Sequence, residues 1–267
     1  MAHRAAFMKK RNAESIHHMR VSIRRLRTVI NILHLVTADE NFERYNQSLR
    51  DLAHILGQGR DQDIFIAMLQ QIPSSFHHDL DAQEQAVYAI ISIRDKFYLQ
   101  IDAALQAKKL DLLFDNLITI FQSGKYTFQP SYSAAADIDK MILDHIHKSV
   151  LKRGRKLGDQ DFSQRHQLRI SLKYLRYALE FLAIDRAAST TAKPYRKTIE
   201  RILSHLGAAN DAFTASRIAR ESLSYKNAQM QLMAGMIAGW SGRAIQDSEA
   251  VLLKSWQKFK SLSPYWD

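Results

Sequence analysis

Two stretches of the chain carry nearly the same sequence. Residues 16–33 read IHHMRVSIRRLRTVINIL and residues 165–182 read RHQLRISLKYLRYALEFL, and the two align without gaps at an offset of 149. Further along, LRDLAHILGQGRDQD (49–63) aligns on IERILSHLGAANDAF (199–213) at an offset of 150. Two matches in the same order and almost the same register indicate an internal repeat.

Both copies of the repeat have the apolar spacing of a packed helix. In steps of three and four, the first copy carries Ile16, Met19, Ile23, Leu26, Ile30 and Leu33. The second copy carries Leu168, Leu172, Leu175, Leu179 and Leu182. Gly and Pro, which form turns, number only 13 of 267 residues. We predict an all-α fold of about ten helices, with two related helical bundles (1–128 and 129–267) about a pseudo-twofold axis.

Several residues predict where the helices begin and end. A glycine and an aspartate recur in both copies, and we expect each glycine to end a helix and each aspartate to cap the next one. These pairs are Gly57 with Asp61 and Gly207 with Asp211. The other predicted caps are Ser163, before the second motif helix, and Thr37 with Glu40 as a capping box.

Positive charge is concentrated in the two repeated regions. The chain has a net charge of +11. Residues 1–34 hold 8 basic and 1 acidic side chains, and residues 145–186 hold 10 and 4. A solvated helix paired with its own charges would alternate in sign, whereas these blocks do not. The pattern predicts a polyanionic partner without identifying it.

The basic side chains fall on one face of each motif helix, because they too are spaced in steps of three and four. The predicted anion-binding residues are His17, Arg20, Arg24 and Arg27 in the first copy, and His166, Arg169, Lys173 and Arg176 in the second. Arg25 points away from this face. The helical run before the second copy adds Lys148, Lys152, Arg153, Arg155 and Lys156. If the halves pack about a twofold axis, both faces can meet in one basic groove, where arginine forks match phosphate oxygens.

Other function classes find little support in the sequence. The absence of cysteine excludes a disulfide scaffold and a thiol nucleophile. We find no P-loop, and His145 and His147 lack the i,i+4 spacing that places two metal ligands on one helix face. We therefore expect no catalytic residue, metal site or cofactor. No apolar run approaches the ~20 residues of a membrane span, and no signal peptide is evident, so we expect a cytoplasmic protein without membrane contact.

The order of these motifs resembles the CHAD family, the conserved histidine α-helical domain. HxxRVxxRRLR and HxxRIxxKxLR are followed by LGxxRD and LGxxND, and residues 239–267 also look like the C-terminus of that family. The resemblance implies an all-helical fold and binding of inorganic polyphosphate along the basic surface, with association with polyphosphate granules. The family's motif residues fall on His17, Arg20, Arg24, Arg25 and Arg27, and on His166, Arg169, Lys173 and Arg176.

Three departures and two alternatives accompany this interpretation. Tyr174 stands where the family often has a base, and Asn210 replaces the arginine seen at Arg60. The helix that precedes the first motif is expected to be absent or shortened.

A nucleic-acid binder would share the salt dependence, although the basic faces offer few aromatics for stacking. A phosphotransfer or phosphohydrolase enzyme would need a metal cage or a glycine-rich cradle. Protein partners stay unknown.

Overall fold

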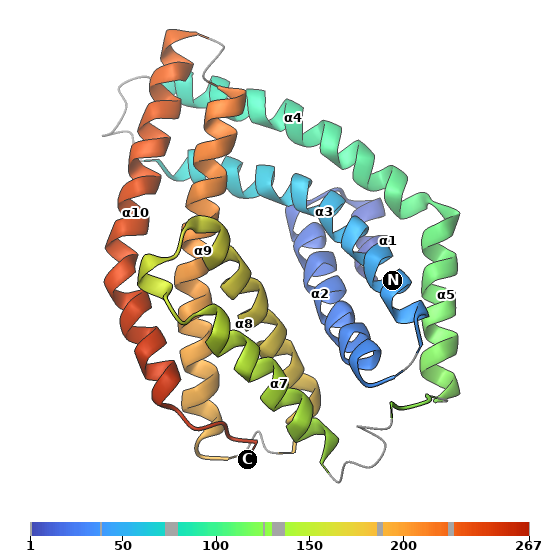
Figure 1. Cartoon of the computed structure of the whole chain (residues 1–267). Helices are drawn as coiled ribbons and strands as arrows, with labels where there is room; N and C mark the ends of the chain where they lie inside the picture. Colours follow the sequence, from blue (N-terminus) through green and yellow to red (C-terminus); the bar gives the residue numbers. More distant parts are fainter. Residues whose placement is uncertain are drawn as a thin grey trace. The chain divides into compact units, whose positions relative to one another are not determined.

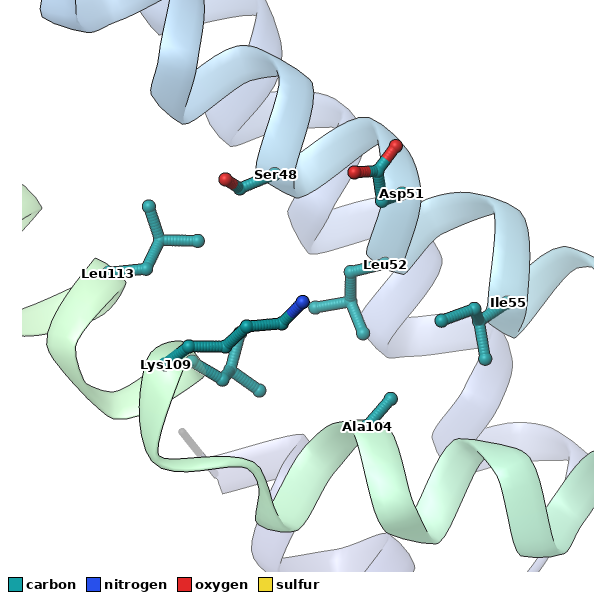
Figure 2. A pocket seen from close by; sticks show the side chains of 8 residues that line it. Ser48, Asp51, Leu52, Ile55, Ala104, Lys109 and Leu113 are labelled. Carbon is teal, nitrogen blue, oxygen red and sulfur yellow. The ribbon is translucent and has the colours of Figure 1, made fainter.

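The computed structural model describes residues 2–37, 39–72, 80–124, 126–129, 137–185, 189–223 and 227–266 of the chain. Within these residues the fold contains nine α-helices, one short 3₁₀ helix and no strand, so the predicted all-α class is confirmed (Figure 1). The extended backbone includes one isolated antiparallel bridge, between Thr37 and Phe128. None of the described helices is both long and apolar enough to cross a membrane.

The helices are described in chain order. The first five are α1 (Ala2–Lys9), α2 (Ala13–Val36), α3 (Asn41–Gln71), α4 (Leu80–Gln106) and α5 (Lys108–Ser123). The others are α7 (Ile138–Arg153), the 3₁₀ helix η2 (Leu157–Asp159), α8 (Phe162–Leu182), α9 (Ala192–Ser222) and α10 (Ala228–Ser261).

The chain divides into two compact units that are interleaved along the sequence. Unit 1 comprises Met1–Gln129 and Ala215–Ala238, and unit 2 comprises Pro130–Thr214 and Gly239–Asp267. Helices α9 and α10 therefore each contribute one part to either unit. The two bundles predicted from the internal repeat, 1–128 and 129–267, are a different division of the chain. That division stays a prediction, and so does the pseudo-twofold axis.

The core of unit 1 contains the predicted apolar face of α2. Ile16 and Ile30 are completely buried, and they belong to one cluster with residues of α3, α4 and α5, such as Leu56 and Ile101. Farther along α3 and α4, a second cluster joins Phe65 and its neighbours to the end of α9 and the start of α10. Burial of these side chains, at roughly 25 cal/mol per Å² of apolar surface, is what holds the helices together.

Unit 2 buries the equivalent leucines of α8 together with a cluster of aromatic rings. Leu168, Leu172, Leu175 and Leu179 are all buried, as the repeat predicts. The His147 ring lies edge-on to the rings of Tyr195, Phe259 and Trp266, with centroids 5.6–6.1 Å apart. Trp266 Nε1 donates a hydrogen bond to Asp144 Oδ1 at 2.9 Å, so the C-terminal tail is anchored to α7. His147 thus belongs to the core, whereas His145 is exposed.

The helix ends predicted at Gly57 and Gly207 are wrong. Helix α3 runs without a break through Gly57 and Asp61, and α9 runs through Gly207 and Asp211. Neither glycine has a positive φ, so neither is the left-handed residue that ends many helices. The glycines instead lie where a motif arginine crosses the helix, as the site geometry shows.

Two predicted caps are also wrong. The N-cap of α8 is Asp161, not Ser163. Asp161 Oδ1 accepts a hydrogen bond from the Gln164 backbone N–H at 2.8 Å, and Gln164 Oε1 in turn accepts one from the Asp161 backbone N–H. A carboxylate also suits the positive end of the helix dipole better than a hydroxyl does. Thr37 ends α2 by donating from Oγ1 to the Leu33 carbonyl at 2.7 Å, and Glu40 makes no side-chain cap bond.

Candidate anion-binding site

In unit 1 the motif arginine Arg20 lies across α3 at Gly57. Arg20 Nη1 donates a hydrogen bond to the Ala53 carbonyl at 3.0 Å. A methyl group at Gly57 would lie 2.5 Å from the same nitrogen, so a side chain there would push the guanidinium away. Gly57 therefore provides the room in which Arg20 packs against the helix backbone.

Other cations of unit 1 lie on either side of Arg20. Arg27 Nε donates to Asn46 Oδ1 at 2.9 Å, and burial, followed by the charge of Arg50, lowers the pKa of Arg27. Because a guanidinium is effectively always protonated, Arg27 keeps its charge. These contacts place Arg27 and Arg50 together at one end of the face.

His17 marks the other end of the face. Partial burial lowers the pKa of His17 below its ordinary value, and nearby positive charges act in the same direction. Those charges belong to Arg60, His18, Arg24 and Arg20. His17 therefore lies among cations of both α2 and α3, and the neutral imidazole is the favoured form.

We call this set of residues the unit 1 face: His17, Arg20, Arg24 and Arg27 on α2, with Arg50 and Arg60 on α3. Arg50 and Arg60 are not among the anion-binding residues predicted from the sequence. The positions of α3 that face α2 follow helical spacing through Asn46, Arg50, Ala53, Gly57 and Arg60. A helix end at Gly57, which the sequence predicts, would interrupt that periodicity before Arg60.

Unit 2 repeats the arrangement of arginine over glycine. A methyl group at Gly207 would lie 3.8 Å from Arg169 Nε and Nη2, which is ordinary contact. One turn earlier, His166 Nδ1 and Asn210 Oδ1 share a hydrogen bond of 2.8 Å. Arg169 and Gly207 are the repeat equivalents of Arg20 and Gly57, so in each unit the motif arginine lies beside the aligned glycine, more closely in unit 1 than in unit 2. The unit 2 face consists of His166, Arg169, Lys173 and Arg176 on α8.

The unit 2 face is less positive than the unit 1 face. Arg176 lies over the Tyr177 ring, 4.6 Å from its centroid, and Arg176 Nε is 3.9 Å from Glu180 Oε1. The α9 positions that align with Arg50 and Arg60 carry Glu200 and Asn210. Tyr174, the repeat partner of Arg25, is partly buried, and burial raises its pKa, so it adds no charge.

The additional basic residues of the sequence analysis belong to α7 and the turn after it. Lys148 and Lys152 are exposed on the side of α7 opposite its buried stripe, and Arg155 is exposed in the turn. Arg153 Nη1 donates to Gln167 Oε1 of α8 at 3.3 Å, which connects these cations to α8. Trp256 covers the next residue, Gly154, where a methyl group would lie 2.0 Å from the indole.

In unit 1 the helix that precedes the motif is short. Helix α1 has 8 residues, compared with 16 in α7. Two cations at this end of unit 1 are paired with acids, Arg4 with Asp111 and Arg11 with Asp102. Arg25, also predicted at the site, is exposed on α2. The basic residues before the second motif thus follow a 16-residue helix and its turn, whereas those before the first lie on and just after an 8-residue helix.

The buried carboxylate of Asp63 lies close to the unit 1 face. Tyr98 donates its hydroxyl proton to Asp63 Oδ1 at 2.9 Å, and burial raises the pKa of Asp63, although the charge of Arg60 opposes that change. Among the described residues, no three histidine or acidic side chains are grouped as metal ligands.

Comparison with known proteins assigns the chain to a family. The CHAD domain model matches residues 1–220, so the chain belongs to the CHAD family. A crystal structure of the CHAD domain from the plant Ricinus communis has a similar fold, with a TM-score of 0.79 and 23% sequence identity. The match covers 98% of this chain and 86% of that chain.

A second solved structure, PptA from Streptomyces chartreusis, has a TM-score of 0.73 and 13% identity. That match covers 95% of this chain and 93% of the other. At these identities both structures support the fold alone. The search of curated proteins found no match.

Proposed function

We propose that this protein binds inorganic polyphosphate through the unit 1 and unit 2 faces without catalysing a reaction. The observation that carries the proposal is the arginine laid across a helix glycine in both units, with a histidine one turn before it. This arrangement occurs in both units and holds cations side by side. A ligand whose charge repeats along its length explains it best.

The local contacts leave positive charge available for such a ligand. Arg27 donates to the neutral amide of Asn46, which orients the guanidinium group without neutralising it. Cations held this close repel one another, and the repulsion is relieved when an anion lies between them. A polyphosphate chain presents an anionic phosphate at every unit, and arginine forks bind phosphate oxygens in bidentate fashion.

Membership of the CHAD family supports the choice of anion, since polyphosphate binding is what the resemblance implied. The exposed α7 cations Lys148, Lys152 and Arg155 extend the unit 2 face, and we include them in the proposal. That both faces line one groove, and that the protein is cytoplasmic and associates with polyphosphate granules, are further parts of the proposal.

A competition experiment tests the choice of polymer. Labelled polyphosphate is bound to the full chain, and unlabelled polyphosphate, duplex DNA and single-stranded RNA are added at equal phosphate concentration. We expect only polyphosphate to displace the label efficiently. Equal displacement by nucleic acid would instead support the nucleic-acid alternative, and steady release of orthophosphate by the purified protein would show an enzyme.

A pair of substitutions tests the site itself. Arg24→Ala with Arg60→Ala should weaken polyphosphate binding about a hundredfold, at about 1.5 kcal/mol for each charge-assisted hydrogen bond. The slope of log affinity against log salt should become shallower by about two. The control is Arg217→Ala with Arg243→Ala, which removes two exposed arginines, each paired within its own helix. An equal loss in this control would mean that total charge, not the face, determines binding.

A further inference from the structure

A cavity in unit 2 begins where the unit 2 face begins. Three elements enclose it: the start of α8 with Phe162 and His166, α9 with Ala209 and Phe213, and α10 with Ile245. The residues that line it are mostly apolar, which is unexpected beside the cations of the unit 2 face. His166 belongs both to the cavity and to the unit 2 face.

Two aromatic rings form one side of this cavity. Phe162 and Phe213 stack with their centroids 3.7 Å apart and their planes within 18°. Phe213 is nevertheless 41% exposed. An exposed ring in a stacked pair is a platform for a further flat ring, and nucleobases bind proteins in this way.

The cavity also has polar groups in need of partners. Gln160 Oε1 and Arg165 Nε are buried, and no hydrogen-bond partner for either is found among the described residues. The other nitrogens of Arg165 are held by the Glu249 carboxylate at 2.6 and 2.7 Å and by the Leu157 carbonyl. Both atoms are buried beside the cavity and not open to it, so the exposed aromatic ring is the part of the cavity that a ligand would meet.

The cations are placed for the phosphates of the same ligand. With a rise of 1.5 Å per residue, Arg169 and Lys173 follow His166 by about 4.5 and 10.5 Å along α8. A base in the cavity could therefore direct its phosphate chain past His166 and along the unit 2 face.

The unit 1 face has no equivalent of this platform. The positions that align with Phe162 and Phe213 are Ala13 and Asp63. The aromatic pair is thus specific to unit 2, although the arginine over glycine is common to both units.

We infer that unit 2 binds a nucleoside polyphosphate, with the base stacked on Phe213 and the phosphates on the cations of α8. The inference rests on the proposed function in one respect, since the same cations would bind the phosphates of either ligand. The base, however, is recognised by the cavity alone.

Calorimetry on the full chain tests the inference with ATP and inorganic tripolyphosphate, both without magnesium. We expect ATP to bind about tenfold more tightly, the order of magnitude of one base stacked on an aromatic side chain. Phe213→Ala should abolish this preference and leave tripolyphosphate and long-chain polyphosphate binding unchanged. Ala209→Leu, which fills the cavity without removing a contact, should do the same.

The control is Phe121→Ala, a phenylalanine of α5 that is 36% exposed and lies far along the chain in unit 1. Equal affinity for ATP and tripolyphosphate, or a preference that survives both cavity variants, would overturn the inference. A stronger gain with geranyl diphosphate than with ATP would also overturn it, in favour of a lipid phosphate. ATP preference without polyphosphate binding would leave the cavity site standing and refute the proposed function.

Discussion

The two faces share one design and differ in charge. In both, an arginine of the motif helix lies over a glycine of the following long helix. Around Arg20 the partner helix adds Arg50 and Arg60, whereas around Arg169 the aligned positions are Glu200 and Asn210. The repeated motif therefore places cations on both motif helices, whereas the partner helix adds two further cations in unit 1 alone.

The largest expected difference comes from reversing an aligned charge in each unit. Arg24→Glu should weaken polyphosphate binding about a hundredfold, because it removes a contact and places a carboxylate among guanidinium groups. Lys173→Glu should weaken it only about tenfold, because its surroundings are already less positive. Titration of each variant with labelled polyphosphate measures both effects. Equal losses would mean that the two faces contribute equally.

The two glycines give a smaller and more specific contrast. Replacing glycine by alanine inside a helix stabilises by about 1 kcal/mol. At Gly207 there is room for the methyl group, so Gly207→Ala should raise the free energy of unfolding by that amount. At Gly57 the methyl displaces Arg20 from the Ala53 carbonyl, a loss of about 1 kcal/mol that cancels the gain.

Urea denaturation with polyphosphate titration checks this contrast. Gly57→Ala should fold with unchanged stability and bind polyphosphate severalfold more weakly, because Arg20 is misplaced. Gly207→Ala should be more stable with unchanged binding. Weaker binding in both variants, or in neither, would show that the close approach at Gly57 does not position Arg20.

The smallest effect concerns pH and is expected from unit 1. Burial and neighbouring cations lower the pKa of His17, so the folded protein favours neutral imidazole, and His17 opposes folding increasingly as pH falls below its ordinary value of 6.5. Bound phosphate would raise the pKa of His17 again, so binding takes up a proton and strengthens by roughly twofold to threefold on acidification.

This proton uptake can be measured as the change of polyphosphate affinity with pH. The affinity is determined between pH 7.5 and pH 5.5 in buffers of equal ionic strength. His17→Gln should flatten the profile while leaving affinity at pH 7.5 nearly unchanged. If the slope persists in the variant, another group takes up the proton.

The amphipathic helices could be predicted because their signal is local. The apolar stripe from Ile16 to Leu33 and the basic face of the same helix both follow from spacing along one helix. Gly57 could not be interpreted in this way, because glycine suits a helix end as well as a close contact. Only the three-dimensional approach of Arg20 decides between the two.

The residues that were missed lie on partner helices. Arg60 is 43 positions from His17 in the sequence, and the stacked pair of Phe162 and Phe213 joins residues 51 positions apart. Arg60 lies on a periodic face of α3, but the spacing along α3 does not say which helix packs against that face, and the stacked pair leaves no periodic pattern at all. The cap of α8 was missed for a more local reason: Asp161 and Ser163 are both good N-cap residues two positions apart, and the start of the first helical turn decides which of them accepts from the backbone.

The interleaving of the two units has a consequence for how the chain is made. Unit 1 includes residues up to Ala238, and unit 2 includes the fully buried Trp266, which closes the aromatic cluster around His147. During synthesis from the N-terminus, helices α2 and α3 leave the ribosome long before the segments that complete their unit. The cluster that joins α2 to α3, α4 and α5 lies within residues 7–117 and can form early. The cluster that joins α3 and α4 to α9 and α10 must wait for residues 215–237, and the aromatic cluster of unit 2 must wait for Trp266.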